Sequence, residues 1–386
     1  MDILKRYYDA IVFSYGASHP RKLGIEGEDL PGVYSAGDFV SWYNGLPSHR
    51  EAKFNLEGED AVVIGHGNVA LDVARILLTP PEMLAKTDIT NFALEQLKRS
   101  KVKNVSIVGR RGVLQASFTV KELRELTTLP GVRFNTTLPP DIPAPKSLPR
   151  IKQRIVQLLQ KAPFIPAAEL KKCDLLFLLN PTRFVDQNSH VSGVEFEHQR
   201  LLDPVDPYSK IEALGTKHIL KADIVFTSIG YYANTLDGMN HLGSGVAVIR
   251  GVIPNDKGRV KATSTKDFGY VDLEAAATER VPGVYASGWV KTGPTGVIAT
   301  TMYSAFETGD SLVEDWHKGK PFLDPEAETR GWEGFKEAIK HGNRQEVNWD
   351  GWRRIDEEEK QRGAHLNKER EKLVDVQEMM DLVTPK

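Results

Sequence analysis

The stretch Ala61-Val-Val-Ile-Gly-His-Gly-Asn-Val-Ala70 decides the fold of this 386-residue chain. Four apolar residues predict a buried strand, and apolar residues at helical spacing from Ala70 to Leu77 predict a helix over about 69–78. Gly65 permits a tight turn between them, Gly67 lets the backbone approach a pyrophosphate, and Ala70 allows close packing of helix against strand. The stretch therefore predicts a dinucleotide bound with its phosphates at the helix N-terminus, where free N–H groups favour anions.

Further alternation of helices and strands follows. Helices are predicted at about 88–99 and 119–126 with a strand at 105–108, which indicates a mainly parallel sheet with helices on both faces. Two strand-and-turn phrases, at 8–17 and 221–230, accompany two similar phrases, LPGVYSAGD (30–38) and VPGVYASGW (281–289). We therefore predict an α/β fold of two Rossmann-like, doubly wound nucleotide-binding lobes. Chance similarity of two buried strands is the alternative.

The end of the next strand discriminates between nucleotides. NAD sites usually place Asp or Glu there for the ribose hydroxyls, whereas this strand ends in Gly109-Arg110-Arg111. Guanidinium groups match the geometry of a phosphate. We interpret Arg110 and Arg111 as a site for the 2′-phosphate of NADPH, and a solvated basic turn is the alternative.

The phrase Trp289-Val-Lys-Thr-Gly-Pro-Thr-Gly296 is the most distinctive in the chain. Its glycines and proline predict a tight turn, and the small and apolar residues that follow predict a helix starting near Thr295. The N–H groups of a helix N-terminus suit an electron-rich ring edge, and Trp289 offers a flat surface beside it. The phrase is typical of the flavin end of an FAD site, and a structural helix start with a core tryptophan is the alternative.

Composition argues against several classes of protein. The formal net charge of −2 disfavours a protein whose whole surface binds nucleic acid. Cys173 is the single cysteine, so an internal disulfide is excluded, and zinc or iron–sulfur sites within the chain are not expected. The apolar neighbours of Cys173 predict that it lies in the core. No apolar run approaches the ~18–20 residues that a transmembrane helix needs.

Four segments carry a resemblance to a known family: GHGNVALDVARILLTP (65–80), VGRRGVLQASFTVKELREL (108–126), GWVKTGPTGVIATTM (288–302) and REKLVD (370–375). They closely resemble the adrenodoxin-type ferredoxin–NADP reductases, in consistent order along the chain and most weakly between residues 139 and 208. The resemblance implies two cofactors, FAD and NADP(H). The NADP-site residues that it implies are Gly65, His66, Gly67, Asn68, Val69, Arg110, Arg111, Glu122 and Gly296. The FAD-site residues that it implies are Trp289, Gly296, Val297 and Ile298. His66 stands where the family typically has Gln.

The resemblance also implies a reaction. Hydride would pass from NADPH to the flavin, and single electrons would leave to an external, acidic [2Fe-2S] ferredoxin, so no catalytic side chain is expected. Charge complementarity predicts a basic docking face, with the residues Arg124, Arg150, Lys152 and Arg154; a solvated basic helix is the alternative. By the same resemblance the protein is expected in the mitochondrial matrix or at the inner-membrane face, where it could associate peripherally with the membrane.

These segments also suggest how the chain divides. Residues 1–19 are expected to be a remnant of the FAD lobe, residues 20–240 the NADP-binding lobe, and residues 241–386 the C-terminal part of the FAD lobe with a helical tail. The family opens with a strand–GxGxxG–helix unit for FAD and this sequence starts downstream of it, so we expect the FAD lobe to be incomplete. Two alternatives are a truncated NADPH-binding fragment with impaired catalysis, and a flavoprotein resembling the small subunit of glutamate synthase, which normally carries cysteine-ligated clusters.

Overall fold

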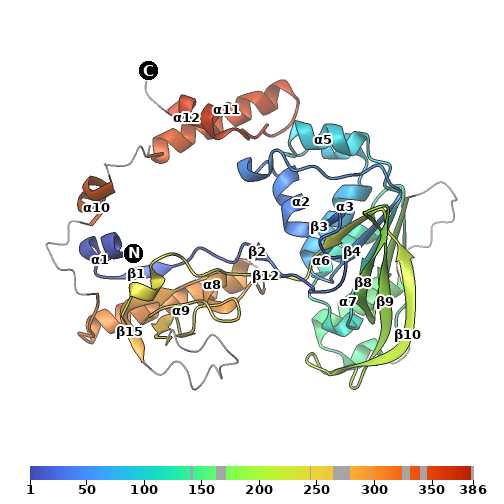
Figure 1. Cartoon of the computed structure of the whole chain (residues 1–386), viewed down its shortest axis with the longest axis horizontal. Helices are drawn as coiled ribbons and strands as arrows, with labels where there is room; N and C mark the ends of the chain where they lie inside the picture. The colour runs from blue at the N-terminus through green and yellow to red at the C-terminus, as the bar shows by residue number, and fades with distance from the viewer. Residues whose placement is uncertain are drawn as a thin grey trace. The chain divides into compact units, whose positions relative to one another are not determined.

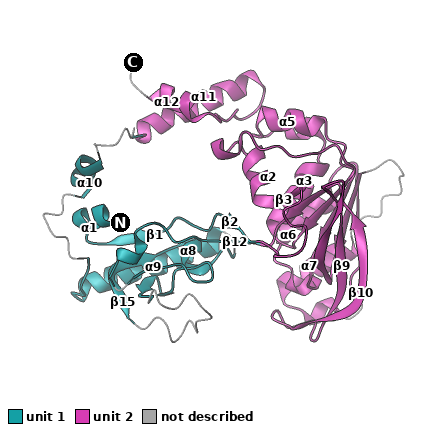
Figure 2. Ribbon diagram, viewed as in Figure 1, with its two compact units in different colours: residues 1–21, 230–346 teal, residues 22–229, 347–386 magenta. Residues whose placement is uncertain are grey.

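The computed structural model describes residues 1–139, 142–161, 171–243, 245–263, 279–296, 298–323, 331–339 and 346–383. The chain divides into two units (Figure 2). Unit 1 comprises residues 1–21 and 230–346, and unit 2 comprises residues 22–229 and 347–386. The first two boundaries lie near the expected 19/20 and 240/241. Residues 347–386 belong to unit 2, whereas the sequence places them with the C-terminal part of the FAD lobe.

A six-stranded parallel sheet forms the centre of unit 2 (Figure 1). Its strands, in spatial order, are β3 (Val33–Ser35), β11 (Ile224–Thr227), β4 (Asp60–Ile64), β5 (Asn104–Val108), β7 (Lys171–Leu176) and β6 (Val132–Thr136). Every neighbouring pair is parallel. The central strands are apolar along most of their length, as expected for strands buried on both faces. The predicted α/β fold is confirmed.

Helices cover one face of this sheet. They are α2 (Ala36–Tyr43), α3 (Asn68–Leu78), α4 (Pro81–Leu84), α5 (Asn91–Lys98), α6 (Val120–Thr127) and α7 (Arg150–Gln160). Their apolar residues share one core with alternate strand residues such as Val63 and Ile107. Cys173 lies in the same core, as predicted, and burial raises the pKa of its thiol. Three short 3₁₀ turns, η1 (Pro47–His49), η2 (Val113–Gln115) and η3 (Pro145–Ser147), lie in the connections.

A second sheet covers the other face. Its strands are β8 (Leu179–Gln187), β9 (His190–Leu201) and β10 (Ile211–Lys221), paired antiparallel in the order β10-β9-β8. Phe184 and Phe196 of this sheet pack against Val62 and Ile64, the strand residues that point away from the helices. Helices were expected on both faces, but in the described part of unit 2 an antiparallel sheet takes one of them. Alternation along β8 and β9 gives that sheet an apolar face to bury.

Unit 1 is built on a smaller mixed sheet. β1 (Ile11–Phe13) is parallel to β15 (Arg280–Ala286), and β14 (Arg259–Lys261) and β13 (Asn255–Asp256) continue the sheet in antiparallel order. β2 (His19–Pro20) pairs separately with β12 (Tyr231–Tyr232). The helices are α1 (Asp2–Tyr7), α8 (Trp289–Thr292), α9 (Ile298–His317) and α10 (Gly331–Ile339), and η4 (Met239–His241) is a 3₁₀ turn. Phe13 and Val284 lie in the hydrophobic core of unit 1.

The internal repeat of the sequence corresponds to a repeated pair of parallel strands. In unit 1, Ile11 lies opposite Val284 and Phe13 opposite Ala286. In unit 2, residues 225–227 lie opposite residues 33–35. When the two Ile-Val-Phe phrases are aligned, this register is displaced by one residue from the register in unit 1. Each unit therefore combines one strand-and-turn phrase with one Gly-Val-Tyr phrase, but the partners are exchanged between the two halves of the chain. This agrees with two related lobes.

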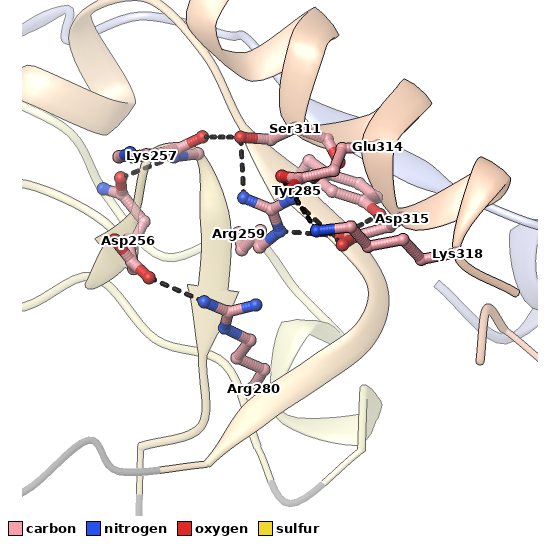
Figure 3. Close-up of polar contacts among 11 residues, drawn as sticks. Asp256, Lys257, Arg259, Arg280, Tyr285, Ser311, Glu314, Asp315 and Lys318 are labelled. Atoms are coloured by element: carbon pink, nitrogen blue, oxygen red, sulfur yellow. Dashed lines mark hydrogen bonds and ion pairs between the residues drawn. The ribbon is translucent and has the colours of Figure 1, made fainter. Parts of the chain in front are cut away.

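An ionic cluster joins α9 to the sheet of unit 1 (Figure 3). Arg259 of β14 is buried, and its guanidinium donates to the two carboxylate oxygens of Asp315 at 2.7 and 3.0 Å and to Glu314 at 2.7 Å. The Tyr285 hydroxyl donates to Asp315 at 3.0 Å. The bond from Arg259 lowers the pKa of Asp315, and burial, with Asp315 beside it, raises the pKa of Tyr285 to about 12. The cluster holds the helix that follows the predicted flavin turn.

The C-terminal tail packs on unit 2. It contains α11 (Trp349–His365) and α12 (Val376–Val383). Lys368 is buried and donates to the carbonyl oxygen of Ile89 at 2.5 Å, and Lys372 forms an ion pair with Asp88 at 2.8 Å. Leu373 is also buried. These contacts anchor the tail beside α5, which is the physical reason that residues 347–386 belong to unit 2.

Candidate nucleotide-binding site

The glycine turn lies between β4 and α3, at the carboxyl edge of the parallel sheet. Gly65 has a φ of +136°, and a Cβ at this position would lie 2.1 Å from the backbone oxygen of Ser228, directly after β11. The Gly65 N–H donates to the Val108 carbonyl at 2.7 Å. Only glycine fits here, because the conformation excludes most side chains and the neighbouring backbone leaves no room for a Cβ.

Gly67 is the N-cap of α3, and its backbone is extended, with a φ of −102°. A Cβ here would meet only the Ser117 hydroxyl oxygen, at 3.5 Å, so packing alone does not demand glycine. No side chain caps the helix. The N–H groups of Asn68 and Val69 have no acceptor in the part of the chain that the structure describes, and the Asn68 side chain accepts the N–H of Thr119 at 2.8 Å. The first turn therefore offers backbone donors to an anion.

The His66 side chain faces inward. Its ring lies 4.8 Å from the Phe177 ring and 6.2 Å from the Phe118 ring, centroid to centroid. The residue is only partly buried, but its Nε2 atom is enclosed and has no partner among the described residues. Burial lowers the His66 pKa to about 4, so the imidazole is neutral near pH 7. The imidazole is therefore a packing group, and the backbone of His66 is what remains for a phosphate.

The two arginines after β5 are not equivalent. Arg110 is exposed, and the described residues give it no hydrogen bond or ion pair. Arg111 is partly buried and donates from Nη1 to the Pro207 carbonyl at 2.9 Å. Because β5 is next to β4 in the sheet, both arginines share the edge of the sheet that carries the glycine turn. The structure thus brings the two predicted parts of the NADP site together.

The start of α6 is tied to the same turn. The backbone N–H groups of Ser117 and Phe118 donate to the His66 carbonyl at 3.0 and 3.2 Å. Glu122, in the first turn of α6, has an enclosed Oε2 atom without a partner in the described chain. Enclosed polar atoms normally have partners, so this oxygen suits a donor on a ligand, such as a ribose hydroxyl. Glu122 therefore stays a predicted residue of the NADP site.

Gln115 is a residue of this region that the sequence does not predict. Its Nε2 donates to the carbonyls of Pro204 and Asp206 at 2.9 and 3.0 Å. Its Oε1 is enclosed and has no partner among the residues described. The contacts join the turn after β5 to the loop between β9 and β10. No pattern in the sequence predicts these contacts, because the acceptors are backbone carbonyls of a distant segment.

The four expected docking cations differ in exposure. Arg124 on α6 and Arg150 and Arg154 on α7 are exposed, and no ion pair of theirs lies within the described ranges. Lys152 is partly buried, its Nζ donates to the Ala116 carbonyl at 2.9 Å, and burial lowers its pKa. Lys152 therefore tethers α7 to the chain before α6, which corrects its expected place among free surface cations.

The predicted flavin residues lie in unit 1. Trp289 opens α8 and is 37% exposed, and Ile298 opens α9 and is 90% exposed. Gly296 has a φ of +79°, and a Cβ there would lie 2.2 Å from the Thr300 hydroxyl oxygen. Val297 lies outside the described residues. Lys291 of α8 donates to the Ser304 carbonyl of α9 at 2.9 Å, which fixes the two helices to each other. An exposed turn without side-chain bulk is compatible with a planar ring.

Comparisons with known proteins show the family of the chain. No protein-family model matches the chain. The chain is 40% identical over 395 residues to NADPH:adrenodoxin oxidoreductase, mitochondrial, of Homo sapiens, covering 98% of this chain and 75% of the relative. It is 37% identical over 399 residues to the probable mitochondrial NADPH:adrenodoxin oxidoreductase of Schizosaccharomyces pombe, covering 99% and 78%. The structure of Mycobacterium tuberculosis FprA in complex with NADPH matches with a TM-score of 0.82 and 31% identity, over 98% of this chain and 80% of that one. The chain therefore belongs to the NADPH:adrenodoxin oxidoreductase family of enzymes.

Proposed function

We propose that this enzyme is an NADPH:ferredoxin oxidoreductase that passes electrons from NADPH through FAD to a ferredoxin. The observation that carries the proposal lies at one edge of the unit 2 sheet. There a glycine turn and a helix N-terminus without a side-chain cap meet the guanidinium of Arg110, which has no partner among the described residues. A helix N-terminus favours a pyrophosphate, and a free guanidinium favours a further phosphate. NADPH carries both groups. The human relative is named for NADPH and for adrenodoxin.

The protein's part in the reaction is to bind and orient. The N–H groups of Asn68 and Val69 would hold the pyrophosphate, Arg110 the 2′-phosphate, and Glu122 a ribose hydroxyl. Arg111 would add positive charge while its Nη1 stays on the Pro207 carbonyl. Bound FAD supplies the two-electron to one-electron conversion, which no side chain can perform.

The flavin is assigned to the turn before α9. Gly296, Val297 and Ile298 would lie along the ring, and Trp289 would cover it. The missing side chain at Gly296 and the exposure of Ile298 support this assignment. The ionic cluster of Arg259 would keep α9 in place beneath the ring.

Replacing Arg110 by Ala tests the nucleotide assignment. A charged hydrogen bond contributes roughly 1.5–3 kcal/mol, so the dissociation constant for NADPH should rise about 10- to 150-fold. Binding of NADH should change little, because NADH lacks the 2′-phosphate. Arg99→Ala, at an exposed arginine just after α5, is the control. Equal losses for NADH and NADPH in calorimetric titrations would reject the assignment.

An absorbance spectrum of the purified protein tests the flavin assignment. A stoichiometric yellow FAD complex supports the enzyme as proposed. Colourless protein that still binds NADPH would instead support an NADPH-binding protein with impaired catalysis, the alternative raised by the sequence.

We assign an acidic [2Fe-2S] ferredoxin as the partner and Arg124, Arg150 and Arg154 as its docking cations, because they are exposed and unpaired in the described surface. Reversing the charge of Arg150 and Arg154 together should slow ferredoxin reduction, most strongly at low salt, and leave NADPH–ferricyanide activity intact. Lys86→Glu, an exposed lysine after α4, is the matched control. Unchanged ferredoxin kinetics in the double variant would remove the docking proposal.

A mitochondrial location follows from the relatives, several of which are named mitochondrial. Within the mitochondrion we propose the matrix or the matrix face of the inner membrane. None of the described helices has the length and apolar composition needed to cross a bilayer. Fractionation of mitochondria with a salt wash would separate the two locations, because electrostatic surface binding is released by salt.

A further inference from the structure

The loop at residues 202–210, between β9 and β10, has a shape of its own. The side chains of Asp203, Asp206 and Ser209 each accept a backbone N–H of the same loop, at 2.9, 2.8 and 2.9 Å. Its two ends are joined by a hydrogen bond from the Leu202 N–H to the Lys210 carbonyl at 3.1 Å. Such bonds from short polar side chains hold a turn in one conformation. These bonds therefore hold the loop in one conformation.

Two residues of the turn after β5 form hydrogen bonds to this loop. Gln115 donates both of its amide hydrogens to loop carbonyls, at 2.9 and 3.0 Å, and Arg111 donates to the Pro207 carbonyl at 2.9 Å. The enclosed Gln115 amide cannot turn to solvent without losing these bonds. The loop thus stands beside the two arginines, held by one of them.

The residue after Pro207 is Tyr208, and its side chain is 87% exposed. Its backbone N–H is held by Asp206, whereas no contact of its ring falls within the described chain. An exposed aromatic ring on a rigid loop, one peptide away from a bonded arginine, presents a flat apolar surface beside the arginine pair. In NADPH the ribose that carries the 2′-phosphate also carries the adenine, so a phosphate on Arg110 places an adenine within the reach of this loop.

The geometry points to Tyr208 as the stacking platform for the adenine of NADPH, with Gln115 as the positioning residue that holds its loop. This inference rests on the proposed NADPH site. It also divides the arginine pair by role: Arg111 is committed to the loop, and Arg110 is the guanidinium free to fork onto the 2′-phosphate. Stacking of a base on an aromatic side chain depends on the ring of the base and not on the other groups of the ligand.

Calorimetric titration with adenosine 2′,5′-bisphosphate and with inorganic pyrophosphate tests the inference. Tyr208→Ala should weaken the adenosine bisphosphate roughly tenfold and leave pyrophosphate unchanged, since pyrophosphate has no ring. Tyr208→Phe should restore binding to within about twofold of the parent, because the ring is what stacks. Val205→Ala, an exposed residue of the same loop, is the matched control and should change neither ligand.

Gln115→Ala should also weaken the adenosine bisphosphate, by loosening the loop, and should speed amide hydrogen exchange at 202–210. Unaltered binding in Tyr208→Ala together with a loss in Arg110→Ala would overturn the inference and leave the NADPH site standing. No loss in either variant would reject the NADPH site itself. Weaker pyrophosphate binding in Tyr208→Ala would also overturn the inference, because a stacking residue should not affect a ligand without a ring.

Discussion

Alanine at Gly65 and alanine at Gly67 should have opposite consequences, although both glycines belong to one motif. At Gly65 the φ of +136° is a conformation that alanine rarely adopts, and a Cβ would lie 2.1 Å from the Ser228 backbone oxygen. At Gly67 the backbone is extended, and a Cβ would make an ordinary 3.5 Å contact with the Ser117 hydroxyl. Alanine at Gly65 should therefore destabilise the fold, whereas alanine at Gly67 should weaken only the binding of a ligand.

The magnitudes follow from these contacts. Strained backbone at Gly65 costs about 1–3 kcal/mol, and forcing a methyl group between packed strands costs about 1–3 kcal/mol more. Gly65→Ala should therefore lower the free energy of unfolding by about 2–6 kcal/mol. Gly67→Ala changes an N-cap glycine to alanine and should cost less than about 1 kcal/mol. Its methyl group would occupy the space above the first turn of α3, so NADPH should bind at least tenfold more weakly.

Urea unfolding followed by circular dichroism measures the first effect, and calorimetric titration with NADPH measures the second. The variants are each other's controls, because each should be affected in one assay more than in the other. If Gly67→Ala unfolds as early as Gly65→Ala, packing rather than ligand approach explains both glycines. If Gly67→Ala binds NADPH like the parent, the pyrophosphate does not lie on this turn.

Two further predictions concern charged groups. The pKa of His66 is about 4 in the folded chain and near 6.5 when the chain is unfolded. The unfolded state therefore binds the proton more tightly. As the pH drops from 6.5 to 4, the free energy of unfolding should fall by up to about 3 kcal/mol. Above pH 6.5 His66 should add no pH dependence to the free energy of unfolding. Denaturant titrations at pH 4.5 and 7 should therefore show a smaller difference in this free energy for His66→Gln than for the parent protein. Arg259→Ala strands the Asp315 carboxylate in a mostly buried site and should cost about 3 kcal/mol. Thermal unfolding of Arg259→Ala, Asp315→Ala and the double variant measures the coupling, and strictly additive losses would show that the pair does not interact.

The local elements of unit 2 followed closely from the sequence. The expected strand at 61–64 is Asp60–Ile64, and the expected helix at 69–78 is Asn68–Leu78. Both depend on periodicity and on glycine and proline at their ends, which act over a few residues. The glycine turn and the arginine pair were also expected to meet, because consecutive parallel strands end at the same edge of a sheet.

Side-chain commitments could not be foreseen. Lys152 and Arg150 occupy the same predicted basic helix, yet Lys152 is bonded to the Ala116 carbonyl and Arg150 is exposed. Arg110 and Arg111 are identical neighbours, yet only Arg111 meets the Pro207 carbonyl. In both cases the acceptor is a backbone oxygen of a distant segment, and any residue type supplies one.

The repeated phrases show most clearly where local pattern ends and long-range packing begins. Apolar composition and the glycine turns were enough to identify two strands of each kind. Their pairing was not encoded locally, because the four phrases are so alike that periodicity favours no partner over another. In the folded chain Ile11 lies opposite Val284, and Val225 lies opposite Val33. That exchange is decided by which apolar faces the two separate cores can bury, since burial of surface from distant segments outweighs local preference.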